Sequence, residues 1–81
     1  MKHEEVRSVI DKLVLEKGTK SGQTYILDFS IKEVLDRLSA KNTEGNQRYI
    51  RYVIQAWYDK ATLFPGQGDN GGLVHLKVRS V

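Results

Sequence analysis

The residues from Gly45 to Ala61 restrict the fold of this chain more than any other stretch, because their apolar side chains follow a helical period. Apolar residues recur there at i, i+3, i+4 and i+7, which places them on one side of a helix. They are Ile50, Val53, Ile54 and Trp57. The opposite side carries Arg48, Arg51, Tyr52 and Gln55. We therefore expect a helix from about Gly45 to Lys60 with a buried apolar face that includes Trp57 and a solvent-facing polar face.

Two further helices are predicted in front of this one. The stretch from Met1 to Lys17 has one apolar stripe, made by Val6, Val9, Ile10, Leu13 and Val14. Gly18 follows it directly, and glycine at that position favours a helix end in the left-handed conformation. We expect this first helix to be scaffold, because acidic residues on its outer side make it a poor surface for DNA.

The second helix has the clearest start signal in the chain. Ser30 and Glu33 have the spacing of a capping box, and Phe29 and Val34 have that of a hydrophobic staple. The helix is predicted to start at Ile31 and to end near Ser39 or Ala40. A polar turn from Ala40 to Glu44 then leads to the next helix, with Asn42 or Thr43 as its cap.

Three strands are predicted around these helices, at Tyr25–Phe29, Thr62–Phe64 and Leu73–Val78. The last two flank the glycine-rich loop from Pro65 to Gly72, as in a β-hairpin. Because a hairpin alone is marginally stable, we expect Tyr25–Phe29 to pair with it. Thr19–Thr24 is predicted to be a polar loop. The fold class is therefore α+β, with three helices and a small antiparallel sheet of three strands.

Composition limits the protein to a few classes. The chain has 81 residues, enough for one small domain, and its formal net charge is +3 with an isoelectric point of about 9.3. It has no cysteine, which excludes disulfides and thiolate metal sites. No apolar run approaches the length of about 18 residues that indicates a membrane span. We expect a cytoplasmic protein without a membrane partner.

No residue pattern indicates catalysis or a cofactor. The segment Gly66–Gly71 fits G-x-G-x-x-G, but the apolar stretch LVHLKV that follows is a predicted strand, not the helix that would hold a phosphate. The two histidines, His3 and His75, have no Cys, Asp or Glu at metal-ligand spacing. No nucleophile or carboxylate pair has a recognisable catalytic context. We expect neither an enzyme nor a metal site.

The order helix, strand, helix, helix, strand, loop, strand resembles the winged-helix family of DNA-binding domains. The resemblance covers nearly the whole chain. It depends on the segment FSIKEVLDRL, which is followed by the segment RYIRYVIQAW and by a glycine-rich hairpin. It implies a single winged-helix domain over residues 1–81. It also implies a protein that binds double-stranded DNA as a homodimer, as a regulator of transcription or a replication-associated factor.

The resemblance assigns the DNA contacts to the third helix and to the hairpin loop, which is the wing of the family. The third helix would enter the major groove, so that its polar side chains reach base edges or phosphates. The implied DNA-binding residues are Arg48, Arg51, Gln55 and Tyr52, with Gln47 at the helix start, Lys41 beside it, and Gln67 and Asn70 in the wing. Lys77 and Arg79 add positive charge in a flanking strand.

Two departures from the family pattern favour an alternative function. The wing has no Lys or Arg and contains Asp69, and Glu44 and Asp59 fall on the same helical face as Arg48. The alternative is a winged-helix module that docks a protein partner through the outer face of the same helix. The effect of salt separates the two, because DNA binding weakens steeply as the salt concentration rises.

Overall fold

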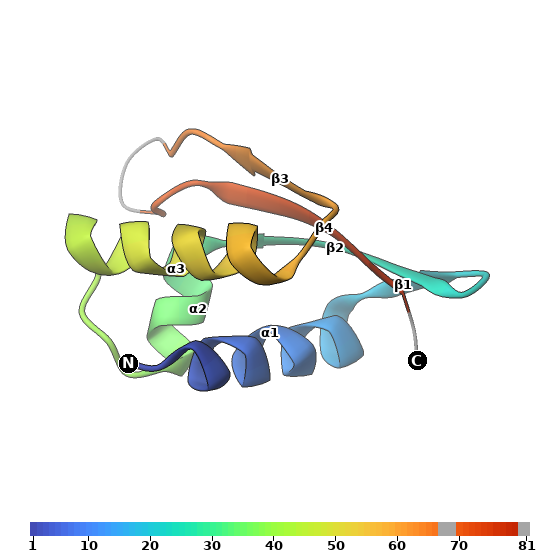
Figure 1. Cartoon of the computed structure of the whole chain (residues 1–81), viewed down its shortest axis with the longest axis horizontal. Coiled ribbons are helices and arrows are strands. Elements are labelled where there is room, and N and C mark those ends of the chain that lie inside the picture. Colours follow the sequence, from blue (N-terminus) through green and yellow to red (C-terminus); the bar gives the residue numbers. More distant parts are fainter. Residues whose placement is uncertain (67–69, 80–81) are drawn as a thin grey trace.

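Three helices and a four-stranded antiparallel sheet make up the part of the chain that the structure describes, residues 1–66 and 70–79 (Figure 1). The structure is a computed structural model. The helices are α1 (His3–Lys17), α2 (Ile31–Arg37) and α3 (Glu44–Trp57), and the strands are β1 (Thr19–Ser21), β2 (Thr24–Ser30), β3 (Ala61–Phe64) and β4 (Leu73–Arg79). The predicted α+β class with three helices is confirmed. The predicted number of strands is wrong, because a fourth strand is present.

The additional strand is β1, which lies in the stretch predicted to be a loop. Thr19–Ser21 pairs with Thr24–Ser30, with Lys20 opposite Tyr25. Gly22 has φ 62°, which lets the chain reverse between the two strands. All three β1 residues are polar and exposed. The alternation of apolar and polar residues that predicts a strand is therefore absent from β1.

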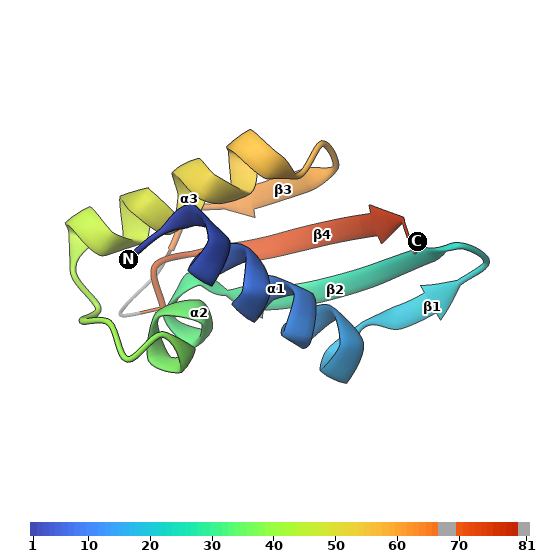
Figure 2. The same cartoon turned by 60° about the horizontal axis from the view of Figure 1, so that its bottom comes forward.

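The sheet has the strand order β1-β2-β4-β3, so β4 is hydrogen-bonded on both sides. It pairs with β2 along seven residues and with β3 along four. The predicted pairing of the Tyr25–Phe29 strand with a later strand is therefore confirmed. The helices pack against one face of this sheet (Figure 2), where Leu27, Phe29, Val74 and Leu76 are buried.

Helix α1 confirms the predicted apolar stripe but not the predicted helix end. Val6, Ile10 and Leu13 are fully buried in the core. Gly18 has φ −66° and ψ 141°, so the predicted left-handed conformation is wrong. The chain instead runs directly from the helix into β1. Glycine still fits this position for another reason, since a Cβ on Gly18 would lie 2.4 Å from the carbonyl oxygen of Val14.

Side-chain caps start the other two helices where the sequence predicts. The Ser30 hydroxyl accepts a hydrogen bond from the Glu33 N–H at 3.1 Å, and the Thr43 hydroxyl accepts one from the Asn46 N–H at 3.1 Å. The Glu33 carboxylate forms an ion pair with Lys17 of α1. Both helices end earlier than predicted. Helix α2 ends at Arg37, before Ser39 takes φ 53°, and α3 ends at Trp57.

The core lies between the helices and the sheet and is entirely apolar among the described residues. It contains Val6, Ile10, Leu13, Val14, Leu27, Phe29, Ile31, Val34, Leu35, Ile50, Val53, Ile54, Val74 and Leu76. Trp57 is not part of it: the side chain is 50% exposed, so the prediction that it is buried is wrong. Trp57 is the last residue of α3, and its ring contacts the start of α1 instead. No helix in the described residues is long and apolar enough to cross a membrane.

Candidate functional site

The outward face of α3 is fixed by the residues on its buried face. Ile50, Val53 and Ile54 have no exposed surface, and α3 packs against α1, α2 and β3. Residues about half a helical turn away must then face solvent. Arg48, Tyr52, Gln55 and Glu44 are indeed exposed. The structure therefore brings three of the predicted contact residues, Arg48, Tyr52 and Gln55, together on one helix surface, with Arg51 at its border.

The most exposed cation of this surface has an acidic partner one turn earlier. Arg48 Nη2 lies 2.9 Å from Glu44 Oε1, and the two side chains are 72% and 76% exposed. An exposed i, i+4 ion pair on a helix contributes only about 0.3–0.5 kcal/mol. Arg48 can therefore exchange Glu44 for an anion of a ligand at small cost.

Arg51 has a different role, because it connects α3 to the β3–β4 loop. Its Nη1 donates a hydrogen bond of 2.8 Å to the carbonyl oxygen of Gly71. The same end of the loop is bonded to the start of α2, through the N–H of Ile31 to Gly72 O and the N–H of Lys32 to Asn70 O. Arg51 is half-buried, so only part of its guanidinium is available to a ligand.

The remaining predicted contact residues lie around the start of α3 and in the loop. Gln47 Nε2 donates to Asn42 Oδ1 at 2.6 Å, and the exposed Lys41 accepts a bond from Asn46 through its carbonyl oxygen. Asn70 Oδ1 accepts the N–H of Gly72 at 2.8 Å, so its side chain shapes the loop. Gln67 and Asp69 lie outside the described residues.

A second group of side chains lies along the side of α3 that faces the start of α1, and sequence reasoning missed its contact with His3. We call His3, Tyr49, Tyr52 and Trp57 the aromatic cluster. The His3 ring lies 5.6 Å from Tyr49, 5.7 Å from Tyr52 and 6.3 Å from Trp57 between ring centroids. Trp57 Nε1 donates to His3 Nδ1 at 2.9 Å. No local pattern relates residue 3 to residues near 50, so the sequence carries no signal for this contact.

Arg7 and Tyr58 extend the contact between α1 and the end of α3. The Arg7 guanidinium lies 4.1 Å from the centroid of the Trp57 ring, within the range of a cation–π interaction. Tyr58 Oη donates to Asp11 Oδ1 at 3.4 Å. Burial, and then the nearby Asp11 carboxylate, raise the pKa of Tyr58 to about 12. Helix α1, which was predicted to be scaffold alone, thus forms one border of the α3 surface.

The surface has no feature that would hold a metal ion. Among the described residues, no group of three or more His, Cys, Asp or Glu side chains is arranged for metal binding. His75 Nδ1 lies 2.6 Å from Asp28 Oδ1 on the opposite side of the sheet. Comparison of the chain with family models, with curated proteins and with solved structures found no match.

Proposed function

We propose that this chain is a winged-helix protein that binds double-stranded DNA, with α3 as its recognition helix and the β3–β4 loop as its wing. The observation that carries the proposal is the outward face of α3. It presents Arg48, Tyr52 and Gln55 to solvent beside a loop that Arg51 fixes to the helix. The preceding α2 and the six-residue connection 38–43 give the helix-turn-helix order that this function requires.

The dimensions of α3 suit the major groove of DNA. Its 14 residues correspond to a length of about 21 Å. An α-helix with side chains is about 10–12 Å wide, and the groove is about 12 Å wide. Arginine pairs with guanine and glutamine with adenine through two hydrogen bonds each, while a tyrosine hydroxyl bonds phosphate. Gln47 and Arg48, near the helix start, would lie deepest in the groove.

Salt-dependent binding to a duplex tests this proposal. Fluorescence anisotropy with a labelled duplex of about 30 base pairs, between about 50 and 200 mM salt, should show affinity that falls steeply as salt rises. Arg48→Ala should weaken binding several-fold, because one cationic contact is lost. For the same reason, the slope of the logarithm of the binding constant against the logarithm of the salt concentration should fall in magnitude by about one. Glu44→Gln should strengthen binding, because it removes a negative charge and releases Arg48.

Arg37→Ala is the matched control for the arginine substitution. Arg37 also forms an ion pair with a carboxylate, Glu16, but on the α1–α2 side of the molecule. The proposal predicts almost no change in DNA affinity for this variant. Equal losses in Arg37→Ala and Arg48→Ala, or no binding of the natural protein at the lowest salt concentration, would contradict it.

A second candidate function is supported by the aromatic cluster. Tyr52 and Trp57 are 60% and 50% exposed, and aromatic side chains are enriched at protein interfaces. On this proposal the end of α3 docks a protein partner or a second copy of the chain, as in a homodimer. Binding would then respond little to salt, and Tyr52→Ala would weaken it while Arg48→Ala would not.

A further inference from the structure

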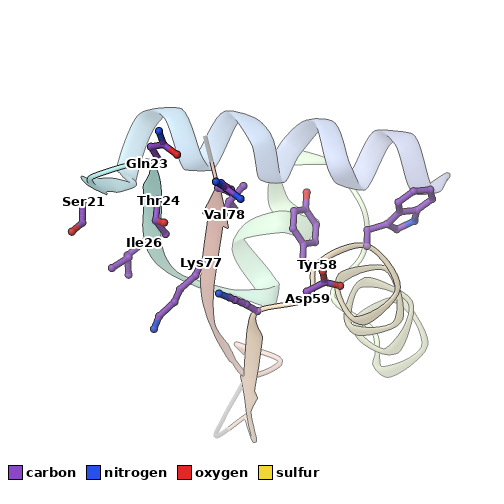
Figure 3. Close-up of a pocket in the computed structure, with 11 residues that line it drawn as sticks. Ser21, Gln23, Thr24, Ile26, Tyr58, Asp59, Lys77 and Val78 are labelled. Carbon is purple, nitrogen blue, oxygen red and sulfur yellow. The ribbon is translucent and has the colours of Figure 1, made fainter. Parts of the chain in front are cut away.

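A cleft with a basic lining opens at the end of the sheet opposite the β3–β4 loop. Its volume is about 830 Å³. It is lined by the β1–β2 hairpin, by the residues between α3 and β3, and by the last residues of β4 (Figure 3). In Figure 3, Lys77 and Ile26 extend away from α1, whereas the Tyr58 hydroxyl points toward it. The cleft therefore wraps around the end of the sheet and reaches its uncovered face.

The strand register places the polar lining of this cleft on the uncovered sheet face. Lys77 lies opposite Ile26, Arg79 opposite Thr24, and Thr24 opposite Ser21. Alternate residues of a strand point to the same face. The residues between them in β2 and β4 pack toward the core. The sheet face that no helix covers therefore carries Ser21, Thr24, Ile26, Lys77 and Arg79. Two cations and two hydroxyl groups thus share one face of the sheet.

A backbone hydrogen bond holds the main chain of a third basic residue beside them. The Lys77 N–H donates to the carbonyl oxygen of Lys60 at 3.0 Å, where the chain enters β3. Lys60, Lys77 and Arg79 all line the cleft. Like charges that line one cleft repel one another, and an anion between them relieves this repulsion.

No carboxylate of the described residues neutralises this group. Lys17, Lys32, Arg37 and Arg48 each have an ion-pair partner, but Lys60, Lys77 and Arg79 have none among the described residues. Asp59 is the one acidic residue in the lining. Asp28, further along the same face, is bonded to His75. The described lining therefore holds three cations and one carboxylate and carries a net positive charge.

We propose that this cleft binds a phosphate-bearing ligand of the nucleotide class. Lysine and arginine side chains are the usual donors to phosphate, and the Ser21 and Thr24 hydroxyls add neutral donors. Tyr58 and Trp57 also line the cleft, and Arg7 covers one face of the Trp57 ring, which leaves the other face for a base. The volume lies within the range of about 300–1,000 Å³ typical of small-ligand sites.

This site is separate from the proposed DNA surface. Arg48 belongs to the first half of α3, whereas the cleft is lined from the last residue of α3 onward, by Trp57 to Lys60; Figure 1 shows these two ends of the helix. The ligand phosphates can belong to a free nucleotide or to a strand of nucleic acid. Binding of a free nucleotide in the cleft does not require the protein to bind duplex DNA, so the two proposals can fail independently.

Nuclear magnetic resonance of the ¹⁵N-labelled full chain tests the site. The probes are inorganic pyrophosphate, a nucleoside triphosphate and a 5′-phosphorylated single-stranded oligonucleotide. We expect amide shifts at Ser21, Thr24, Lys60, Lys77 and Arg79, with little change at Gln47 and Arg48. Lys77→Gln and Arg79→Gln should each weaken pyrophosphate binding about fivefold, because each removes one charged donor.

Lys12→Gln is the matched control, because it removes the same charge from an exposed position on α1. It should leave the affinity for pyrophosphate nearly unchanged. Shifts in the cleft with pyrophosphate and the nucleoside triphosphate would identify a site for free nucleotides, and shifts with the oligonucleotide alone would identify a nucleic-acid strand. Absence of cleft shifts with all three probes, or equal losses in Lys12→Gln and the cleft variants, would overturn the proposal.

Discussion

The two ends of α3 are attached to the rest of the molecule by different kinds of contact. At the start, Thr43 caps the helix and Arg51 bonds the carbonyl oxygen of Gly71, so the contacts are polar. At the end, Trp57 packs against His3 and Arg7, so the contacts are largely aromatic. One helix thus offers two surfaces of different chemistry.

This difference shows which partner each end suits. Exposed ion pairs are weak, so the cationic end can exchange its internal partner for a phosphate at low cost. Aromatic rings contribute most to the binding free energy when their apolar area is removed from water. The end with Trp57 therefore suits a partner with an apolar surface. The DNA proposal depends mainly on Arg48 and the protein-docking proposal on Trp57, with Tyr52 common to both, so substitutions at Arg48 and Trp57 separate them.

The largest expected effect comes from a residue on the buried face of α3. Ile54 is fully buried in the core, and Ile54→Ala should lower the free energy of unfolding by about 2–5 kcal/mol through lost burial and a cavity. Urea denaturation followed by circular dichroism measures this change. Gln55→Ala, at the exposed neighbouring position, should change stability by less than about 0.5 kcal/mol. Similar values for the two variants would mean that α3 is not held by its apolar face.

An intermediate effect is expected from the loop attached to the start of α3. Gly71 has φ 72°, and a Cβ there would lie 3.0 Å from Gln47 Cγ and 3.1 Å from Ile31 Cβ. Gly71→Ala should therefore cost about 1–3 kcal/mol of stability by thermal denaturation. It should also weaken DNA binding, because it displaces the loop from α3.

Gly45→Ala is the control for the same substitution in the first turn of α3. A Cβ at Gly45 meets no atom within 4 Å, so this variant should be neutral or more stable by about 0.5 kcal/mol. If Gly71→Ala is as stable as Gly45→Ala, the loop does not pack on the helix as described.

The smallest effect concerns the other end of α3 and appears only at high pH. The pKa of Tyr58 is raised from 10.0 to about 12 in the folded protein, so folding favours the protonated phenol. The associated stability is complete below pH 10.0 and is lost as the pH rises toward about 12. Unfolding measured from pH 9 to pH 12 should thus show a weaker pH dependence in Tyr58→Phe than in the natural protein (about one proton at most). The same slope in both proteins would exclude Tyr58 as the source.

Local chemistry in the sequence predicts most of the fold. Ser30 and Thr43 mark helix starts because each hydroxyl bonds an N–H three residues later, within the same short segment. The buried face of α3 is predicted from spacing alone, because the apolar residues Ile50, Val53 and Ile54 recur at a helical period. The sheet pairing of Tyr25–Phe29 follows from the need of a hairpin for a third strand. These features depend on neighbours in sequence or on a general requirement of sheets.

The features that sequence reasoning missed depend on contacts between distant residues. Strand β1 is exposed and has no alternation of apolar and polar residues. It forms because the chain reverses at a glycine turn and pairs with β2. Trp57 has the spacing of the apolar stripe of α3 but lies at the edge of the core. Its hydrogen-bond partner, His3, is 54 residues away in the sequence. Lys60, Lys77 and Arg79 line one cleft only because β4 extends past the start of β3.

The position of β4 also affects the order in which the protein can fold during synthesis. β4 is the last of the seven elements in the described residues, yet it lies between β2 and β3. Until residues 73–79 have left the ribosome, β2 and β3 each have an unpaired edge, and the apolar side chains of α3 lack part of their cover. The helices can form early from local signals, but the sheet can close only after translation of its central strand.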